Sequence, residues 1–297
     1  MSYFDKLHCI RWNIGFIEKN ICDIYSSGDT FFDVKWVKHD YDYRFFADPF
    51  ILSVNENVIK VLVEEFFYEK KKGVISLLNI DVKNYELIDK KILLDQPFHQ
   101  SYPFILRHNG KTYVLPEASE SGNLFIYDFD EQNETLCNQR VLIPEPLLDS
   151  TICQINDRWF LFCTKKGPGK NSDLYVYESD DPLGGFKPVN DGKPLVNDLE
   201  TARPAGYFVN VGDDLFRVSQ VCSKFYGEYV KLLKLNSILP FDQTFIKNIK
   251  VQNSEFCRSI HTVNGFGGIT VVDGTKRTFR PVFQIINAIK YYLLYKR

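Results

Sequence analysis

The sequence predicts an all-β protein, a five-bladed β-propeller followed by a short C-terminal amphipathic helix. This prediction depends on three observations: a hairpin pattern that recurs five times, a spacing of about 50 residues between equivalent positions, and little helical periodicity. Repeats of about 40–50 residues with several strands each are typical of propeller blades. A pair of β-sandwiches is the alternative architecture, because such domains also contain many short strands.

Residues 1–280 are predicted to form the propeller, with residues 1–39 as its N-terminal closure segment. The apolar-rich stretch Ile10–Ile17 is predicted to be a strand that completes the last blade and closes the ring. Residues 18–39 are expected to connect this strand to the first blade and to contain one further strand.

Each repeat contains two apolar runs joined by a turn rich in Asn, Gly and Asp, which is typical of a β-hairpin. Asp273-Gly274 is expected to be the turn after the last run. Further strands are predicted at Gly73–Ile80, Leu124–Phe129 and Leu174–Glu178. The five predicted hairpins are Pro49–Val54 with Val58–Val63, Tyr102–Arg107 with Thr112–Leu115, Thr151–Ile155 with Arg158–Cys163, Ala205–Val211 with Leu215–Val218, and His261–Asn264 with Ile269–Val272.

The C-terminal segment, residues 281–297, breaks the hairpin pattern and is predicted to be an amphipathic helix. It begins with Pro281, which is compatible with a helix start, and ends with Lys296 and Arg297, which suit a helix end. Its apolar residues fall on one helical face. This face either packs on the propeller or lies on an anionic membrane surface or a partner.

The composition limits the classes of partner and the cellular compartment that we expect. A net charge of −2 gives no general electrostatic reason to bind nucleic acid. Seven cysteines without a CxxC pair favour reduced thiols in a cytoplasmic protein, and no zinc site or cofactor is predicted. The N-terminus lacks a signal-peptide core, and no apolar run reaches the length of a membrane span. A peripheral position at the inner membrane surface is the alternative that the tail suggests.

The candidate site consists of residues at equivalent positions in the five repeats. In a propeller the first strand of every blade lines the central channel, so such residues converge although they are far apart in sequence. Glu117, Gln220 and the pair Glu64-Glu65 end the following strand and are expected to reach or support the same face. The convergent set comprises Asp48, Ser101, Tyr102, Asp149, Arg203 and His261.

Asp48 is the central residue of this prediction. Pro49 favours an extended conformation for the residue before it, so Asp48 is expected to be extended at the start of a strand. Two carboxylates facing each other across a cleft are typical of glycosidic-bond chemistry. The alternative assigns these residues to hydrogen bonds between blades, with Arg203 in an ion pair with Asp48, Asp149 or Glu200.

Ordered motifs run through about residues 10–275. Together they resemble the N-terminal propeller domain of plant glucosamine inositolphosphorylceramide transferases and its bacterial relatives. The bacterial relatives are often associated with the biosynthesis of surface polysaccharides. The resemblance adds Tyr226 to the candidate substrate-binding residues. The motifs are Phe46-Ala47-Asp48-Pro49-Phe50 with Glu64-Glu65, Ser101-Tyr102-Pro103-Phe104 with Pro116-Glu117, Asp149-Ser150-Thr151 with Arg158-Trp159-Phe160-Leu161-Phe162, Ala202-Arg203-Pro204-Ala205-Gly206, Gln220, Tyr226-Gly227 and His261-Thr262.

At the level of fold, the family is similar to the five-bladed arabinanase, β-xylosidase and invertase group of glycosidases. Asp48 and Asp149 match the first two catalytic carboxylates of that group, but no Glu stands at the third position near Arg203, so Glu117 is the substitute. The resemblance therefore implies glycosyl transfer from an activated sugar, with Asp48 as base or nucleophile.

The remaining roles follow from this expectation. Asp149 and Glu117 bind hydroxyls or act as acid, Arg203 and His261 hold an anionic leaving group, and Tyr102 stacks on a sugar ring. Ser101, Gln220, Tyr226 and Glu65 complete the predicted substrate-binding set. The expected substrates are a carbohydrate, a sugar phosphate or a nucleotide sugar, with a lipid-linked acceptor and a partner transferase as further partners. A glycosidase-like hydrolase, a glycan-binding or scaffold propeller and a protein-interaction propeller are the alternatives.

Overall fold

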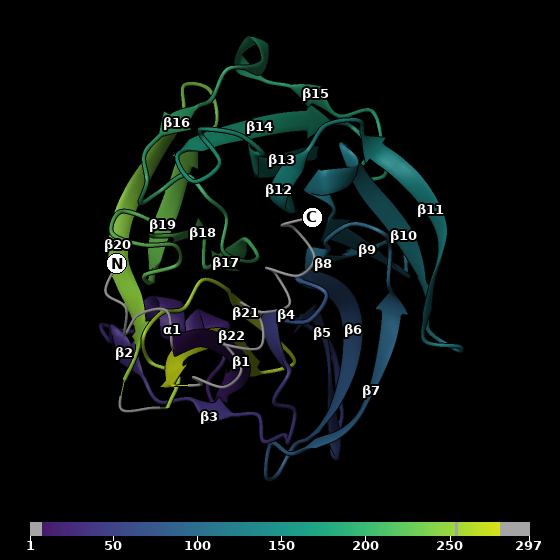
Figure 1. The fold of residues 1–297 in the computed structure, drawn as a ribbon. Helices are drawn as coiled ribbons and strands as arrows, with labels where there is room; N and C mark the ends of the chain where they lie inside the picture. Colours follow the sequence, from purple (N-terminus) through teal and green to yellow (C-terminus); the bar gives the residue numbers. More distant parts are fainter. Residues whose placement is uncertain (1–7, 253–254, 280–297) are drawn as a thin grey trace, which may run out of the picture.

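The computed structural model describes residues 8–252 and 255–279, which form five antiparallel sheets arranged in a ring (Figure 1). This arrangement confirms the five-bladed β-propeller. The predicted helix at residues 281–297 lies outside the described residues. Within the described part, no helix has the length and apolar character needed to cross a membrane, and no disulfide joins the cysteines.

The first three blades follow the chain order from the centre of the ring outward, so each blade begins at the channel. The first blade contains β4 (Arg44–Val54), β5 (Val58–Phe67), β6 (Lys72–Asp81) and β7 (Leu87–Leu94). The second contains β8 (Ser101–His108), β9 (Lys111–Glu117), β10 (Leu124–Asp130) and β11 (Thr135–Ile143). The third contains β12 (Leu147–Ile155), β13 (Arg158–Lys165), β14 (Asp173–Ser179), β15 (Lys187–Pro188) and the short β16 (Val196–Asn197).

The last two blades incorporate the N-terminal segment. The fourth contains β17 (Val209–Val211), β18 (Asp214–Gln220), β19 (Val230–Ser237) and β20 (Asp242–Val251), with β2 (Phe31–Phe32) added in parallel at its edge. The fifth contains β21 (Val263–Phe266), β22 (Ile269–Phe279), β1 (His8–Ile17) and β3 (Lys35–Trp36).

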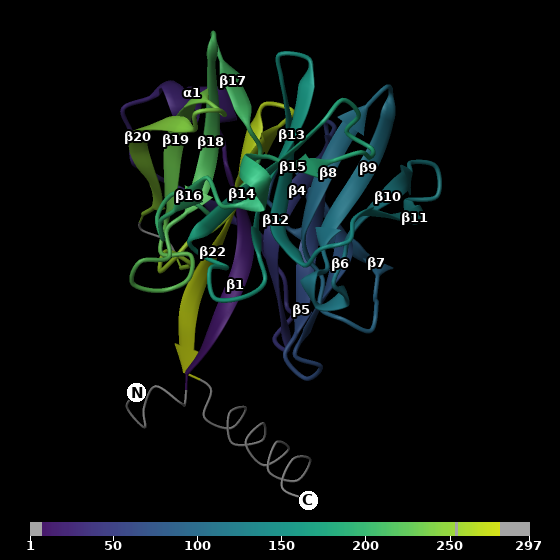
Figure 2. The same cartoon turned by 90° about the horizontal axis from the view of Figure 1, so that it is seen from above.

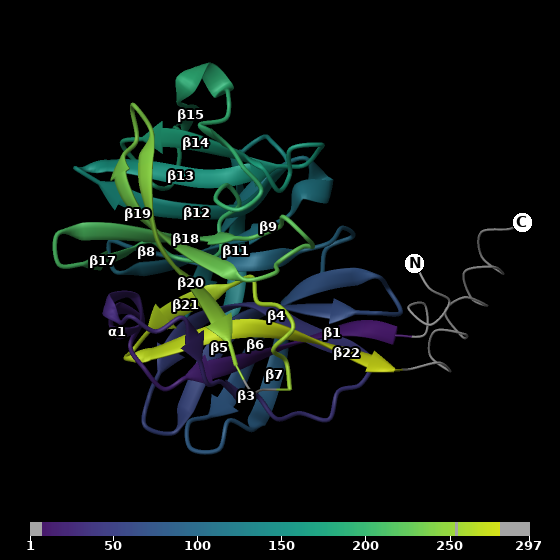
Figure 3. The same ribbon diagram turned by 90° about the vertical axis from the view of Figure 1, so that its left-hand side faces the viewer.

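The N-terminal strand closes the ring, as predicted. β1 pairs antiparallel with β22 from His8 opposite Phe279 to Ile17 opposite Thr270. In Figure 1 the purple β1 and the yellow β22 lie side by side. Figures 2 and 3 show these two strands extending beyond the others at one face, opposite the β17–β18 hairpin.

Three sequence predictions differ from the structure in detail. Residues 18–39 contain a helix, α1 (Ile21–Ser26), which Asn20 caps by accepting a hydrogen bond from the Cys22 N–H. The predicted turn at Asp273-Gly274 is wrong, because β22 continues to Phe279 and keeps its partner strand β1. Gly274 fits there since a Cβ would collide with the Phe256 carbonyl and the Trp36 ring. The first run of the fourth blade is also shorter than predicted.

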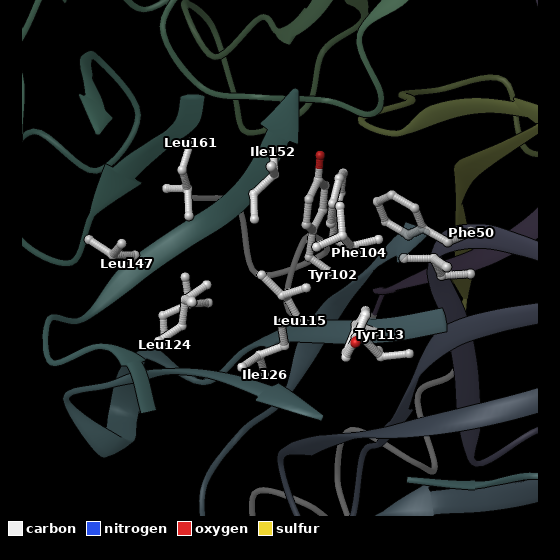
Figure 4. Close-up of a cluster of buried hydrophobic side chains, with 14 of the residues drawn as sticks. Phe50, Tyr102, Phe104, Tyr113, Leu115, Leu124, Ile126, Leu147, Ile152 and Leu161 are labelled. Carbon is white, nitrogen blue, oxygen red and sulfur yellow. The ribbon is translucent and has the colours of Figure 1, made fainter. Parts of the chain in front are cut away.

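The largest hydrophobic cluster fills the space between the first three blades (Figure 4). Phe50, Tyr102, Leu115, Ile152 and Leu161 are each at most 5% exposed. Because every blade packs both faces against its neighbours, the strands bury apolar residues on both sides. Each fully buried large side chain contributes about 1.5–3 kcal/mol, and this packing fixes the inner strands that carry the site.

Candidate functional site

Three inner strands share one irregularity, and each places a candidate residue. β4, β8 and β12 each contain one residue more than the partner strand, between Ala47 and Phe50, Ser101 and Phe104, and Leu148 and Thr151. The bulges hold Asp48, Tyr102 and Asp149 at φ of 51°, 42° and 49°. β-Bulges redirect side chains and often lie next to functional sites.

The predicted extended conformation of Asp48 is therefore wrong. Pro49 disfavours the right-handed helical region for Asp48, but the bulge imposes the left-handed region instead. A non-glycine residue in this region costs about 1–3 kcal/mol, and such strain clusters at functional sites. Tyr102 is the less usual case, because Asp tolerates the left-handed region better than bulky residues do.

Asp48 is surrounded by hydrogen-bond donors from two other blades. Its Oδ1 accepts from the Thr262 hydroxyl at 2.9 Å and its Oδ2 accepts from the Tyr102 N–H at 3.2 Å. His261 Nδ1 lies 3.7 Å from Oδ1. Burial raises the pKa of Asp48 to about 6, and Asp149 and Asp273 add to the rise although His261 opposes it.

Asp149 occupies the equivalent bulge in the third blade but has different partners. Its Oδ2 accepts from Arg203 Nε at 2.5 Å and from Gln220 Nε2 at 2.6 Å. Arg203 also donates to the Asn171 side chain at 2.9 Å. This confirms the alternative in which Arg203 forms an ion pair with Asp149.

Gln220 leaves one polar atom unsatisfied in this region. Its Nε2 donates both to Asp149 and to the Pro204 carbonyl, at 2.9 Å for the latter, which fixes the orientation of the amide. The Oε1 is buried and accepts no hydrogen bond from the described residues. A buried acceptor without a donor costs free energy, so the two hydrogen bonds of Nε2 hold Gln220 at a cost to the folded state.

Two further carboxyl groups complete the cluster, Glu117 at the end of β9 and Glu64 on β5. Burial, followed by the negative charge of Asp149, raises the pKa of Glu117 to about 8. Burial and the charges of Asp48 and Glu117 raise the pKa of Glu64 well above its usual range. Like charges in a buried site cannot all ionise, so Glu117 is mostly protonated at neutral pH, and the same repulsion favours the protonated form of Glu64.

Glu65 does not join this cluster. Successive residues of a strand point to opposite faces, and Glu65 faces Arg44 at 2.7 Å, Lys90 at 3.0 Å and the Ser76 hydroxyl at 2.6 Å. Of the predicted pair, Glu64 is thus the residue that interacts with the other site carboxyls.

Tyr102 is also placed differently from its predicted role. Its ring is fully buried in the hydrophobic cluster, and its hydroxyl bonds to Thr151 at 2.8 Å (Figure 4). The ring contacts Phe50 edge-on at a centroid distance of 4.9 Å. It cannot stack on a sugar in this position, so its contribution to the site is the backbone N–H that it donates to Asp48.

Tyr226 is the aromatic residue that is accessible at the site. The residue is 42% exposed, and its ring contacts the Arg203 guanidinium and the His261 ring. The Arg203 guanidinium is 5.0 Å from the Tyr226 centroid, and the His261 ring meets it edge-on at 5.2 Å. His261 in turn stacks on Trp12 at 4.0 Å. The exposed part of Tyr226 is suited to contact the apolar C–H face of a sugar that carries an anionic group.

Ser101 is the remaining predicted residue, and it lies within the ring of site residues. It is 6% exposed and pairs in register with Glu117 across β8 and β9. Ser101, Glu117, Gln220, Arg203, Asp149 and Asp48 are therefore brought together by the fold, with His261 and Tyr226 beside them.

Sequence reasoning missed Asp273, which contacts both Asp48 and His261. The three residues offer ligand atoms within 4.8 Å of one another and could surround a small cation. However, Asp273 Oδ2 already accepts from the Asp48 N–H at 3.1 Å and lies 2.5 Å from His261 Nδ1. The groups that would bind a metal are therefore already hydrogen-bonded to one another.

The fold and site define a five-bladed propeller with a buried, carboxyl-rich centre. A sequence profile described as the N-terminal part of glucosamine inositolphosphorylceramide transferase 1 matches residues 33–270. The chain belongs to this family, which confirms the resemblance seen in its motifs. It is similar to glucosamine inositolphosphorylceramide transferase 1 of Oryza sativa subsp. japonica, 29% identical over 67% of this chain and 27% of the relative.

The Arabidopsis thaliana relative of the same name is 30% identical, with 65% of this chain and 26% of the relative aligned. The chain thus spans about a quarter of the length of these curated relatives.

Solved structures of glycosidases share the fold. An α-L-arabinofuranosidase from Podospora anserina has a TM-score of 0.60 at 11% identity, covering 80% of this chain and 93% of that structure. The catalytic domain of an α-L-arabinofuranosidase from Coprinopsis cinerea has a TM-score of 0.62 at 12% identity, covering 78% of this chain and 82% of that domain. At these identities the likeness concerns the architecture alone.

Proposed function

We propose that this propeller acts on carbohydrate and transfers a glycosyl group from an activated sugar. The observation that carries the proposal is that the fold brings two buried carboxyl groups, Asp48 and Glu117, together in one site. With a pKa of about 6, Asp48 is mostly ionised at neutral pH, whereas Glu117, with a pKa of about 8, is mostly protonated. Paired groups whose pKa values are pushed apart are suited to act as base and acid.

In the proposed reaction Asp48 takes the proton of an acceptor hydroxyl as that oxygen attacks the anomeric carbon of the donor. The bond from this carbon to the leaving phosphate oxygen breaks, and the phosphate departs with the electron pair. Glu117 donates a hydrogen bond to a sugar hydroxyl, or acts as acid by giving its proton to the leaving phosphate oxygen. A nucleophilic role for Asp48, with a glycosyl–enzyme intermediate, is the variant of this mechanism.

The neighbouring groups support an anionic donor. His261 keeps a positive charge more readily than an ordinary histidine: burial alone would lower its pKa, but Asp273 and Asp48 raise it overall. Together with Arg203, it places a guanidinium and an imidazole beside Tyr226. A leaving phosphate would be held there while Tyr226 contacts the sugar.

The family membership supports a place in the assembly of cell-surface glycans or glycolipids. The curated relatives are glucosamine inositolphosphorylceramide transferases by name, so a sugar donor and a lipid-linked acceptor are the substrate classes that we propose. We propose a cytoplasmic or peripheral membrane location, where activated sugars are available to such an enzyme. A separate partner transferase would be needed only if this chain presents the substrate.

The test is a thermal-shift screen with nucleotide sugars, sugar phosphates and oligosaccharides, followed by product analysis. A ligand stabilises the folded protein by RT ln(1 + [L]/Kd), so weak binding is visible at high concentration. The proteins compared are the wild type, Asp48→Asn and a control variant, Asp213→Asn, at an exposed hairpin position. We expect stabilisation by a phosphorylated or nucleotide sugar in all three and consumption of that ligand in the wild type and the control only.

A glycan-binding propeller is the second candidate, because no Glu stands at the third catalytic position near Arg203. In that case an oligosaccharide would stabilise the wild type and Asp48→Asn equally, and no product would form. Release of a free sugar from an oligosaccharide by the wild type alone would indicate the hydrolase alternative. Full turnover by Asp48→Asn would contradict the catalytic role of Asp48.

A further inference from the structure

Asp273 is a fully buried carboxylate in the middle of β22, and its two oxygens take four hydrogen-bonding contacts. Oδ1 accepts from the His261 N–H at 2.9 Å and from the Thr262 N–H at 3.0 Å. Oδ2 accepts from the Asp48 N–H at 3.1 Å and lies 2.5 Å from His261 Nδ1. One side chain thus joins β22, the segment before β21 and the bulge of β4.

We propose that Asp273 is the positioning residue of the site, fixing Asp48, Thr262 and His261 relative to one another. The Asp48 N–H would otherwise lack a ladder partner, because the bulge removes it from the register with β5. Asp273 supplies the missing acceptor and so holds the left-handed backbone that aims the Asp48 side chain.

The same carboxylate acts on the Asp48 side chain through its two neighbours in the chain. By holding the Thr262 N–H, Asp273 places the Thr262 hydroxyl 2.9 Å from Asp48 Oδ1. By accepting from Nδ1, it fixes the His261 ring, which Trp12 of β1 supports by stacking. Among the described residues, the one hydrogen bond from the fifth blade to the Asp48 carboxylate, from the Thr262 hydroxyl, therefore depends on the position of Asp273.

The arrangement differs from an ordinary structural cap in one respect. A cap accepts hydrogen bonds from backbone N–H groups alone, whereas Asp273 also contacts Nδ1 of the buried His261 side chain. The titratable groups that face this histidine are Asp273, Asp48 and Tyr226, with Asp149 further away. Asp273 is the only one of them at 2.5 Å, so it sets the charge and tautomer of the ring.

The test compares Asp273→Asn with Thr275→Val by nuclear magnetic resonance. Asparagine has one acceptor oxygen, so it cannot satisfy all four donors. We expect the His261 pKa to fall by about 1–3 pH units and the protection of the Asp48 amide against hydrogen exchange to fall at least tenfold. Thr275 is a buried residue on the same strand whose hydroxyl bonds to Ser259, so its variant is expected to leave both values unchanged.

A folded Asp273→Asn protein with the wild-type His261 titration and Asp48 amide protection would overturn the proposal. If Asp273→Asn does not fold, the wild type decides the question through the ring nitrogen signals of His261. We expect a hydrogen-bonded proton on Nδ1 at neutral pH, and an unprotonated Nδ1 would overturn the proposal. These readouts need no substrate, so they remain decisive even if the proposed transfer reaction is wrong.

Discussion

Asp48 and Asp149 occupy the same position in two blades, yet their side chains have different hydrogen-bond and ion-pair partners. Both stand in a one-residue bulge of an inner strand, at φ of 51° and 49°. Asp149 is ion-paired with Arg203 and hydrogen-bonded by Gln220. Asp48 has no arginine or lysine partner among the described residues and accepts from one hydroxyl and one backbone N–H.

The difference shows how a repeated backbone can produce distinct chemistry. The same bulge is present in β4 and β12, and in both strands it holds an aspartate at the channel. The partners come from other blades, where the residues differ, and they decide whether the charge of the carboxylate is compensated by a cation or the group remains reactive. Asp149 therefore organises charge in the site, while Asp48 remains able to exchange a proton near neutral pH.

The largest expected effect concerns the ion-paired side of this comparison. Arg203→Met leaves Asp149 buried without its cation, so we expect a loss of about 3–5 kcal/mol in the free energy of unfolding. Urea denaturation measures it. The control is Arg140→Met, whose ion pair with Asp128 is partly exposed and is expected to contribute about 0–1 kcal/mol. A loss below 1 kcal/mol in Arg203→Met would show that Asp149 does not need its cation.

The second prediction concerns the protonated carboxyl group of Glu117, which interacts with both aspartates. Folding raises the Glu117 pKa from 4.5 to about 8. Between these two pH values the folded state keeps a proton that the unfolded chain has lost. The resulting stability is present below about pH 4.5 and is lost as the pH rises towards 8. We expect the wild type to lose a few kcal/mol of unfolding free energy between pH 5 and 8.

Glu117→Gln should flatten this pH dependence, because glutamine does not titrate. Urea denaturation at several pH values checks it, with Glu56→Gln, an exposed hairpin residue, as the control that follows the wild type. Parallel curves for Glu117→Gln and the wild type would show that Glu117 is not a buried acid with a raised pKa.

The smallest expected effect concerns the donors around Asp48. Thr262→Val removes the hydroxyl that donates to the Asp48 carboxylate, and hydrogen bonds to charged groups are worth about 1.5–3 kcal/mol. We therefore expect the pKa of Asp48 to rise further, by about 1–2 pH units. Carboxyl carbon resonances report this titration. Thr112→Val is the control, because that hydroxyl bonds to Glu131 in the second blade. An unchanged Asp48 titration in Thr262→Val would remove Thr262 from the site.

The sequence was sufficient to predict the propeller, the ring closure and the convergence of Asp48, Asp149, Arg203 and His261. These features follow from strand spacing and from equivalent positions in the repeats, which a one-dimensional pattern contains. Local conformation was harder to predict. Pro49 predicted an extended Asp48, but the register with β5 imposed a bulge that the preceding-proline rule does not describe.

Side-chain direction was also beyond the sequence pattern. Glu64 and Glu65 are adjacent, and only the observed register shows that Glu64 faces the carboxyl cluster. Tyr102 occupies a site position through its backbone while its ring belongs to the core. Asp273 was hidden within Asp-Gly, which favours a turn, because the pairing of β22 with β1 is a long-range contact.

The most direct test of the account is the titration of Asp48 itself in the free wild-type protein. The carboxyl carbon signal is assigned by its absence in Asp48→Asn and followed from pH 3 to 9. We expect a pKa of about 6, because burial and the neighbouring carboxylates outweigh the effect of His261 on the Asp48 pKa. An Asp48 that titrates at or below its ordinary value of 3.8 would show a permanently ionised carboxylate like those of ordinary ion pairs. That result would contradict the division of roles between Asp48 and Asp149.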